Sequence, residues 1–309
     1  MEIIGIDHGY KNMKGTHVMF PTKLSKLNCR PDETQIDGVV EYEGEYYTIY
    51  GSPLAAVNTH NKSESREYYI LTLAMLGAEF EARKIAPGPN KIHVRLACGL
   101  PQQWYDQQKE AFKEMLIQNR EPHFSYSGKP YNVVIDNVTV YMQGFVALSV
   151  LDCVADKSGH VVLVDIGGET MDVIVCEKFH PMPDQCRIDT RATIALLKDI
   201  DSAIQSRLGA PIPEQDVIRM IVNGSMGKNP ANAYEAVVYD CLKNYAVYVM
   251  TRLKEWGINT DYTEIAFLGG GAKIVKSFGK YGSNIHFCDD IHINAKGYEF
   301  FETMLANKR

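Results

Sequence analysis

Residues 161–172 read VVLVDIGGETMD, an apolar strand that ends in Asp165, followed by a Gly-Gly turn and the start of a second strand. A similar arrangement opens the chain, where residues 3–14 read IIGIDHGYKNMK, with Asp7 at the strand end. Residues 265–272, IAFLGGGA, lead a third apolar strand into three glycines. These patterns predict two aspartate-tipped hairpins and one glycine-rich strand end.

Such elements have the chemistry that binds a nucleoside triphosphate. Glycine in a hairpin turn lets the backbone approach a ligand closely and adopt positive φ, so that successive N–H groups can point at phosphate oxygens. A carboxylate at a strand end would repel phosphate directly, but it can hold a hydrated Mg²⁺ that bridges to it. A second carboxylate can orient an attacking water, because phosphoryl transfer depends mainly on positioning and charge stabilisation. A helix expected at 272–281, after the three glycines, would favour an anion at its N-terminus.

The three elements, in this order, resemble the phosphate and adenosine motifs of the actin-type ATPase superfamily. Residues 7–14 fit the first phosphate motif, D-x-G-x-x-x-x-K, and residues 165–172 fit the second, D-x-G-G-x-T-x-D, at every fixed position. Residues 267–272 fit the adenosine motif. The match spans nearly the whole chain. Residues 99–101, GLP, between an apolar strand and an amphipathic helix, further resemble the N-terminal domain of ParM-like plasmid-segregation actins.

The resemblance implies an α/β, two-lobed actin-like (ribonuclease H-like) ATPase fold with the nucleotide in the cleft between the lobes. The implied domains are residues 1–156, residues 157–291, and a C-terminal helix at 292–309 that returns to the first lobe. At 309 residues the chain also exceeds what a single core usually serves.

Two helices that connect the lobes are also implied by the resemblance. Residues 140–147, VYMQGFVA, resemble the first connecting helix, in which bacterial actin-like proteins often carry Pro-Gln-Gly. Met142 stands in place of the proline here, whereas Gln143 falls where actins place the glutamine that positions the attacking water. Residues 294–298, NAKGY, resemble the second connecting helix.

The resemblance assigns roles to single residues. Asp165, Gln143 and Asp7 would be catalytic, and the two aspartates would hold Mg²⁺ through water. The cofactors would be ATP, or GTP, and Mg²⁺. The expected nucleotide-binding residues are Gly9, Tyr10, Lys11, Asn12, Lys14, Gly167, Gly168, Glu169, Thr170, Gly269, Gly270, Gly271 and Ala272.

Single residues have plainer interpretations too. Asp7 or Asp165 could be an ordinary turn residue, and Gln143 could simply cap a helix or lie on its solvated surface. Lys14 is open between a phosphate contact and a solvated face. Asp172 is expected to orient its loop, and His8 to have no role in binding.

Composition limits the partners and the compartment. The formal net charge of −6 argues against direct, non-specific DNA binding, so DNA as cargo would need a DNA-binding adaptor protein. Seven scattered cysteines without a C-x-x-C pair favour reduced thiols in a cytoplasm.

The longest apolar stretch, 145–155, is interrupted by Ser149 and Asp152 and is too short to cross a bilayer. No G-x-x-x-x-G-K-[ST] sequence occurs, which excludes a P-loop.

Apolar periodicity predicts the secondary structure. We expect strands at 2–7, 15–20, 37–42, 45–50, 91–98, 131–138, 161–166 and 171–176. We expect helices at 65–84, 101–118, 192–208 and 231–256, and a short helix that opens at 211–213. In the first helix Tyr69, Leu73, Leu76 and Phe80 would share one buried face.

The predicted function is that of an actin-like ATPase that polymerises into cytoplasmic filaments and hydrolyses ATP on assembly, for plasmid or phage DNA segregation. Its partners would be further copies of itself and the adaptor, with no membrane. One alternative is a non-polymerising nucleotide-binding scaffold, a class in which a C-terminal amphipathic membrane helix is common, although the C-terminal segment 298–305 is short for one. The other is a small-molecule or sugar kinase, whose catalytic base would have to be Asp136, the nearest carboxylate before Gln143.

Overall fold

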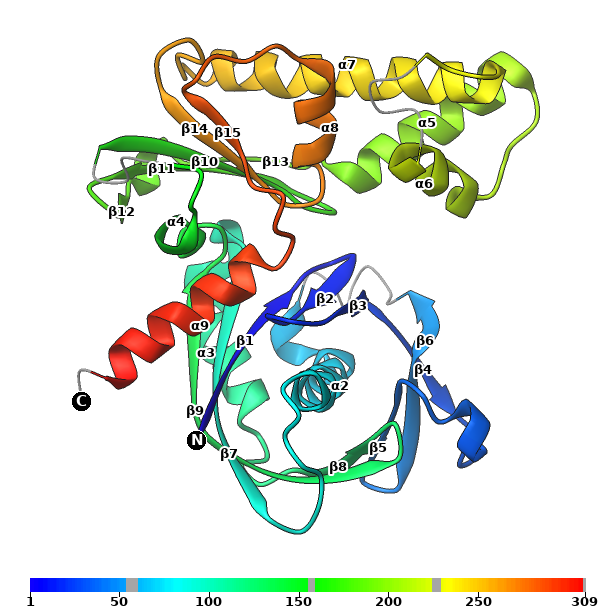
Figure 1. Ribbon diagram of the computed structural model, residues 1–309, viewed down its shortest axis with the longest axis vertical. Helices are drawn as coiled ribbons and strands as arrows, with labels where there is room; N and C mark the ends of the chain where they lie inside the picture. The colour runs from blue at the N-terminus through cyan, green and yellow to red at the C-terminus, as the bar shows by residue number, and fades with distance from the viewer. Residues whose placement is uncertain (54–60, 155–158, 224–228, 308–309) are drawn as a thin grey trace. The chain divides into compact units, whose positions relative to one another are not determined.

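The computed structural model describes residues 1–53, 61–154, 159–223 and 229–307 (Figure 1). The chain divides into two compact units, one formed by residues 1–150 and 292–309 and the other by residues 151–291. The lobe boundary predicted at 156–157 lies outside the described residues.

The first unit is built on a nine-stranded sheet in the order β3-β2-β1-β7-β9-β8-β5-β6-β4. Strands β1, β7 and β9 are parallel neighbours, and the other pairs are antiparallel. The strands are β1 (Glu2–His8), β2 (Asn12–Lys14), β3 (Met19–Pro21), β4 (Lys23–Leu27), β5 (Val39–Tyr42), β6 (Glu45–Pro53), β7 (Lys91–Leu100), β8 (His123–Tyr126) and β9 (Lys129–Met142).

Helix α2 (Arg66–Ala82) lies inside the curve of this sheet, where Figure 1 shows it end-on. Every residue from Tyr68 to Phe80 is buried, so the expectation of one buried face was too narrow. A helix that is apolar all round is a buried helix, and the curved sheet supplies the cover. Ser65 caps its first turn by accepting from the N–H of Tyr68.

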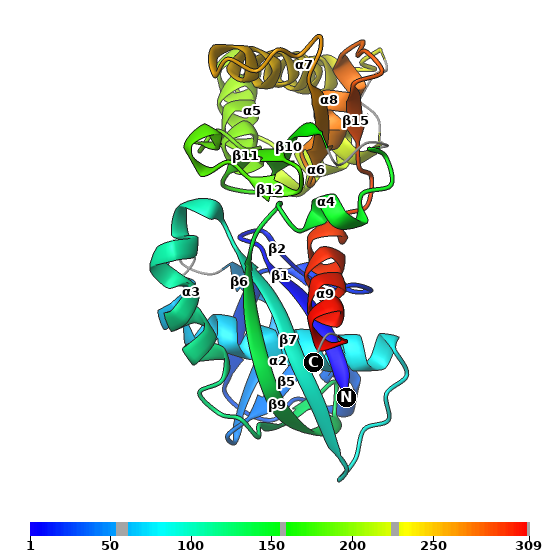
Figure 2. The same cartoon turned by 90° about the vertical axis from the view of Figure 1, so that its left-hand side faces the viewer.

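The remaining helices of this unit are α3 (Gln102–Leu116), α4 (Ala147–Val150) and α9 (Ile293–Ala306), with short 3₁₀ turns η1 (Glu33–Gln35) and η2 (Lys62–Glu64). Figure 2 shows α3 and α9 on either side of β7 and β9. Helix α9 packs closely on β1 at Gly5. Only glycine allows this approach, because a Cβ at Gly5 would lie 2.0 Å from the carbonyl oxygen of Ala295.

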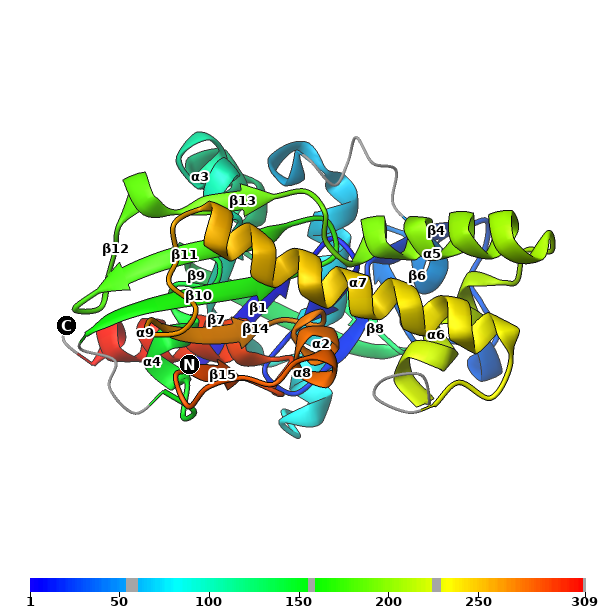
Figure 3. The same cartoon turned by 90° about the horizontal axis from the view of Figure 1, so that it is seen from above.

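The second unit contains a six-stranded sheet in the order β12-β11-β10-β14-β15, with β13 beside β11. Its helices α5 and α7 pack against one another and share a core with the sheet (Figure 3). The strands are β10 (His160–Ile166), β11 (Met171–Glu177), β12 (His180–Pro181), β13 (Arg187–Asp189), β14 (Glu264–Leu268) and β15 (Ile285–Phe287). The helices are α5 (Thr193–Leu208), α6 (Glu214–Asn223), α7 (Ala233–Glu255) and α8 (Ala272–Phe278), with the 3₁₀ turn η3 (Pro183–Gln185).

Two expected elements were wrong. Residues 140–147 do not form a connecting helix, because Val140 to Met142 pair with β7 as the end of β9, and only α4 is helical. Gly144, at φ +80°, turns the chain between them. The strand expected at 15–20 is also interrupted, since residues 15–18 form a turn between β2 and β3. The helix expected at 272–281 ends at Phe278.

Among the described residues, no helix is both long and apolar enough to cross a membrane.

Candidate functional site

The first hairpin joins β1 to β2 and places Asp7 opposite Lys14. Asp7 is buried, and its Oδ2 atom lies 3.4 Å from the Lys14 ammonium. The Oδ1 atom is also buried and has no hydrogen-bond partner among the described residues. A buried carboxylate oxygen without a donor is costly, which makes Asp7 receptive to a donor brought by a ligand or a hydrated cation.

Three carbonyl groups at the tip of this hairpin accept hydrogen bonds from residues outside it. The Lys62 ammonium donates to the carbonyl of His8. Thr22 donates from Oγ1 to the carbonyl of Gly9 (2.7 Å) and from its N–H to the carbonyl of Lys11 (2.9 Å). In a trans peptide the C=O and the following N–H point in opposite directions. The N–H groups that follow these three carbonyls therefore point away from Lys62 and Thr22, as anion-binding backbone must.

Close approach, not positive φ, explains the glycine of the first tip. A Cβ at Gly9 would lie 2.4 Å from the carbonyl oxygen of Asn12, a contact that no side chain allows. Gly9 does not have a positive φ, nor does Gly167 in the second hairpin. A Cβ at Gly167 would lie 3.3 Å from the carbonyl oxygen of Thr170, a much milder contact. The expectation of positive φ at these tips was wrong.

The second hairpin joins β10 to β11 and places Asp165 opposite Asp172. Both carboxylates are buried, and Thr170 donates from Oγ1 to Asp172 Oδ2 at 2.7 Å. Asp172 thus fixes the turn through Thr170, in agreement with the loop-orienting role expected of it. The N–H of Gly167 donates to the carbonyl of Thr170 (2.9 Å), so that amide is used inside the hairpin.

The tip of the second hairpin is held by the first turn of α5. Thr193 donates to the carbonyl of Gly167 from its N–H (3.3 Å) and from Oγ1 (2.9 Å), and the N–H of Ile194 donates to the carbonyl of Gly168 (2.9 Å). These bonds satisfy amides that a helix start leaves unpaired. By the same peptide geometry, the N–H groups of Gly168 and Glu169 point away from α5.

The three glycines after β14 pack onto this hairpin. Strands β10 and β14 are parallel neighbours, with Asp165 opposite Leu268, so their ends lie at one edge of the sheet. Gly269 has φ +77°, and a Cβ there would lie 2.4 Å from Asp165 Oδ1. Gly271 donates its N–H to the carbonyl of Ile166 (3.1 Å), whereas the space around Gly270 is open. The structure thus brings the second phosphate motif and the adenosine motif together, and Ala272 begins α8 beside them.

Gln143 lies in the turn after β9, where its N–H donates to the carbonyl of Leu100 (2.8 Å). The N–H of Gly144 donates to Asn294 Oδ1 of α9 (3.2 Å). Because β1, β7 and β9 are adjacent and parallel, Asp7 and Gln143 lie at the same edge of the first sheet. Neighbouring strands are about 4.8 Å apart, so two strand spacings separate them by roughly 10 Å.

Two residues behind the first tip were not identified from the sequence as parts of the site. Lys62 belongs to the polar segment NKSESRE and reaches the hairpin from η2, whereas Thr22 reaches it from the position directly after β3. His8 is also fully buried, with Nε2 2.9 Å from Thr72 Oγ1. Burial, together with the nearby Lys62 charge, lowers the pKa of His8 to about 3. His8 is therefore neutral and is packed inside the first unit.

No group of three or more His, Cys, Asp or Glu residues that could hold a metal occurs in the described parts of the chain. Asp7 and Asp165 belong to different units. Mg²⁺ keeps most of its waters and takes one or two carboxylates, so an aspartate at either hairpin suits it better than it suits zinc.

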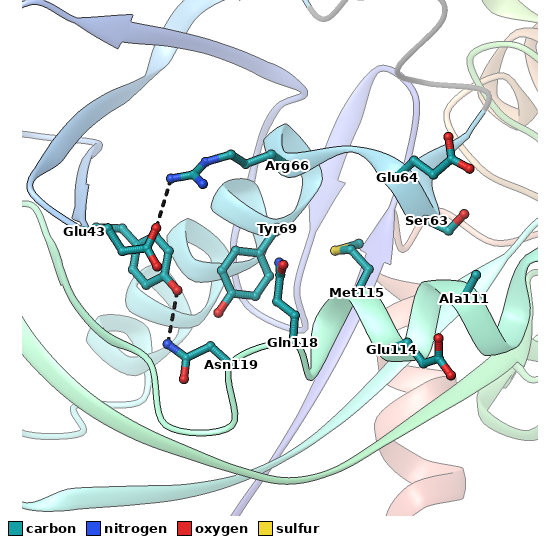
Figure 4. Close-up of a pocket in the computed structure, with 11 residues that line it drawn as sticks. Glu43, Ser63, Glu64, Arg66, Tyr69, Ala111, Glu114, Met115, Gln118 and Asn119 are labelled. Atoms are coloured by element: carbon teal, nitrogen blue, oxygen red, sulfur yellow. Dashed lines mark hydrogen bonds and ion pairs between the residues drawn. The ribbon is translucent and has the colours of Figure 1, made fainter.

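A separate pocket of about 490 Å³ opens in the first unit and contains no residue of the motifs (Figure 4). Arg66 pairs with Glu43 at its rim (3.1 Å), and the buried ring of Tyr69 faces its interior. Ser63 and Glu64 line it from η2, the same short turn that carries Lys62.

Each of the two units contains a segment that matches a protein-family model. Residues 5–145 match the model described as the N-terminal domain of actin-like proteins, and residues 163–279 match the model of the C-terminal domain of archaeal MreB-like actin homologues. No curated protein sequence matches the chain.

Solved structures of similar fold include three informative cases. The apo ParM protein of pSK41 has a TM-score of 0.72 at 20% identity, over 99% of this chain and 98% of its own. A ParM from Clostridium botulinum in a 15-stranded filament has a TM-score of 0.70 at 22% identity, over 98% and 99%. An archaeal actin homologue in complex with ADP has a TM-score of 0.73 at 18% identity, over 98% and 100%. At these identities the likeness establishes the two-domain, α/β actin-like fold.

Proposed function

We propose that this chain, which belongs to the actin-like proteins, is a filament-forming ATPase that engages one ATP·Mg²⁺ with both of its hairpins. The observation that carries the proposal is shared by the two hairpins. In each, an aspartate ends a buried strand and the tip carbonyls are held from behind, so that the following N–H groups point the other way. Such outward N–H groups are what a phosphate chain requires.

The chain's own residues have distinct parts in this proposal. The tip at residues 9–12 and the tip at residues 167–170 bind the phosphates, with Lys14 beside them as a cation. Residues 269–272 approach the nucleoside closely, because glycine leaves room there and Gly270 is open. Gln143 orients the attacking water, and Asp165 accepts a hydrogen bond from it.

Mg²⁺ fits the residues present. The buried Oδ1 atom of Asp7 has no donor among the described residues, and a metal-bound water would supply one. Asp7 and Asp165 would hold the ion through its waters, and the ion would neutralise charge that develops on the phosphates.

Filament formation is supported by a solved structure of similar fold. The similar ParM from Clostridium botulinum was solved as a filament, and the similar archaeal actin homologue was solved with ADP. We propose that this chain likewise assembles with copies of itself in the cytoplasm and hydrolyses ATP on assembly. With a formal charge of −6, it would move plasmid or phage DNA through a DNA-binding adaptor and not by direct contact.

The kinase alternative is weaker because of where Asp136 lies. Asp136 is inside β9, with its carboxylate 3.0 Å from His93 Nδ1. Gln143 lies seven positions further along the chain, just after the end of β9, which amounts to roughly 20 Å. A base so far from the proposed water-positioning group is poorly placed to deprotonate a substrate hydroxyl.

One observation favours the scaffold alternative. Helix α9 leaves Phe300, Met304 and Leu305 more than two-fifths exposed, and exposed apolar side chains of this kind can meet a membrane. Sedimentation with anionic liposomes tests it. Strong binding without polymerisation would favour the scaffold over the filament.

Light scattering after addition of ATP and Mg²⁺, with phosphate release followed in parallel, tests the main proposal. We expect scattering to rise above a critical protein concentration, and phosphate release to increase with it. EDTA should abolish both the rise in scattering and the release of phosphate. Competition with GTP measures the preference between adenine and guanine nucleotides. Flat scattering with turnover proportional to protein concentration would exclude filament-coupled hydrolysis.

A further inference from the structure

We propose that Lys62 is a positioning residue that holds the first hairpin in its phosphate-binding conformation. The inference rests on the proposed function and says how one half of that site is built. Lys62 lies outside every motif and reaches the hairpin from a position 54 residues further along the chain.

Lys62 is a buried cation directly behind the hairpin tip. It is 1% exposed, and its ammonium donates to the carbonyl of His8, the residue between Asp7 and Gly9. The same ammonium lies 4.2 Å from the ring centroid of Tyr10 and 5.5 Å from that of Tyr68. One side chain therefore contacts residues on both sides of Gly9.

The bond to His8 decides which way the next amide points. Because the peptide is planar and trans, a carbonyl that is turned toward Lys62 turns the N–H of Gly9 to the opposite side. The cation–π contact holds the Tyr10 ring against the same ammonium and so limits rotation of the next peptide. Without Lys62, the peptide between His8 and Gly9 could rotate and present its carbonyl oxygen, which repels phosphate.

The charge of Lys62 also suits an anion site. Burying an ammonium is unfavourable unless it gains strong hydrogen bonds or ion partners, so an apolar side chain would cost less if only packing were needed. Lys62 is the cation behind the tip, and Lys14 is the one beside Asp7.

The test compares the affinities of ATP and adenosine for the full chain carrying Lys62→Met. Methionine keeps an unbranched apolar stem, one atom shorter than that of lysine, but removes the donor and the charge. We expect ATP affinity to fall about 10-fold or more, as for loss of a hydrogen bond to a charged group, with adenosine affinity unchanged. The matched control is Lys91→Met, at a lysine of the same unit that is half exposed and paired with Glu121, which should change neither affinity.

A second readout needs no nucleotide. The amide resonance of Gly9 reports the hydrogen bond of the preceding carbonyl, so Lys62→Met should shift it and Lys91→Met should not. If Lys62→Met fails to fold by circular dichroism, Lys62→Gln replaces it, because the shorter, neutral side chain removes the charge and the reach to the His8 carbonyl but keeps a polar group.

The outcomes separate the two proposals. An unchanged ATP-to-adenosine ratio together with an unmoved Gly9 resonance would overturn the role of Lys62. If the wild-type chain binds ATP no better than adenosine, the proposed function fails, and the phosphate role of Lys62 fails with it. That result appears in the wild type, whereas failure of the Lys62 inference alone appears only in the variant.

Discussion

The two hairpins carry the same tip chemistry but are supported in different ways. In the first, side chains from distant segments hold two of the three carbonyls, namely the Lys62 ammonium and the Thr22 hydroxyl, and the Thr22 N–H holds the third. In the second, backbone N–H groups at the start of α5 hold two carbonyls in succession, with the Thr193 hydroxyl as an extra donor. Side-chain donors can be removed by substitution and backbone donors cannot. The first hairpin is therefore the one whose geometry a single mutation can change.

The strands differ in the same direction. Strands β1 and β2 pair at two positions, Asp7 with Lys14 and His8 with Met13, whereas β10 and β11 pair along seven. A short ladder opens more easily than a long one. The turn that follows the first hairpin is itself held by Glu79 of α2, a buried carboxylate that accepts from the N–H groups of His17 and Val18.

The largest effect should come from the second hairpin. Asp165→Ala removes the carboxylate that lies against Gly269, and we expect turnover to fall about 10³-fold, as for loss of a strong transition-state contact. ATP binding should persist, because the backbone donors of α5 still hold the tip. Asp172→Asn is the matched control, since Asp172 lies opposite Asp165 in the strand pair. This variant should lower the melting temperature but leave turnover nearly unchanged. Loss of ATP binding in Asp165→Ala would show that this aspartate acts in binding instead.

The next effect belongs to the first unit. Gln143→Ala should lower turnover about 10²-fold with little change in ATP affinity, the usual result of removing one positioning group. Backbone hydrogen bonds fix the turn, so truncation of the side chain should leave the fold intact. Single-turnover phosphate release checks this. Wild-type turnover would remove Gln143 from the mechanism.

Alanine at the two tip glycines compares the hairpins directly. In Gly9→Ala the new Cβ would lie 2.4 Å from a backbone oxygen, so the tip must distort, and we expect ATP affinity to fall about 10-fold. In Gly167→Ala the contact is 3.3 Å, and a shift of a few tenths of an ångström relieves it. Affinity should then change by no more than about twofold. Equal losses in calorimetric titrations would mean that the two tips are equally constrained.

The hairpins could be predicted from the sequence because they are local. An aspartate at the end of an apolar strand, followed by glycine and a second strand, is contained in a dozen residues, and the fold found here agrees with the resemblance those residues carry. The long helices were predictable for the same reason. Helix α5, for instance, ends at Gly209, whose φ of +71° is typical of a residue that follows a helix.

What could not be predicted depends on contacts distant in sequence. Lys62 stands in a polar segment, NKSESRE, and nothing local indicates that its ammonium is buried behind His8. The expected helix at 140–147 was wrong for a related reason, because sheet pairing with β7 extends the strand to Met142. The catalytic and metal roles of Asp7, Gln143 and Asp165 stay predictions until the variants are measured.

The smallest effect gives the finest comparison, because the same substitution can be made behind each tip. Thr193→Val removes one of two donors to the Gly167 carbonyl, and the N–H of the same residue continues to donate to it. The loss should be about 0.5–1 kcal/mol of unfolding free energy, with ATP affinity changed less than about twofold. In the part of the chain that the structure describes, Thr22→Val leaves the Gly9 carbonyl with only the Tyr68 hydroxyl, at 3.5 Å, and it should cost distinctly more ATP affinity. Identical losses in the two valine variants would show that both tips depend on side-chain hydroxyls, and the difference in support drawn here would not hold.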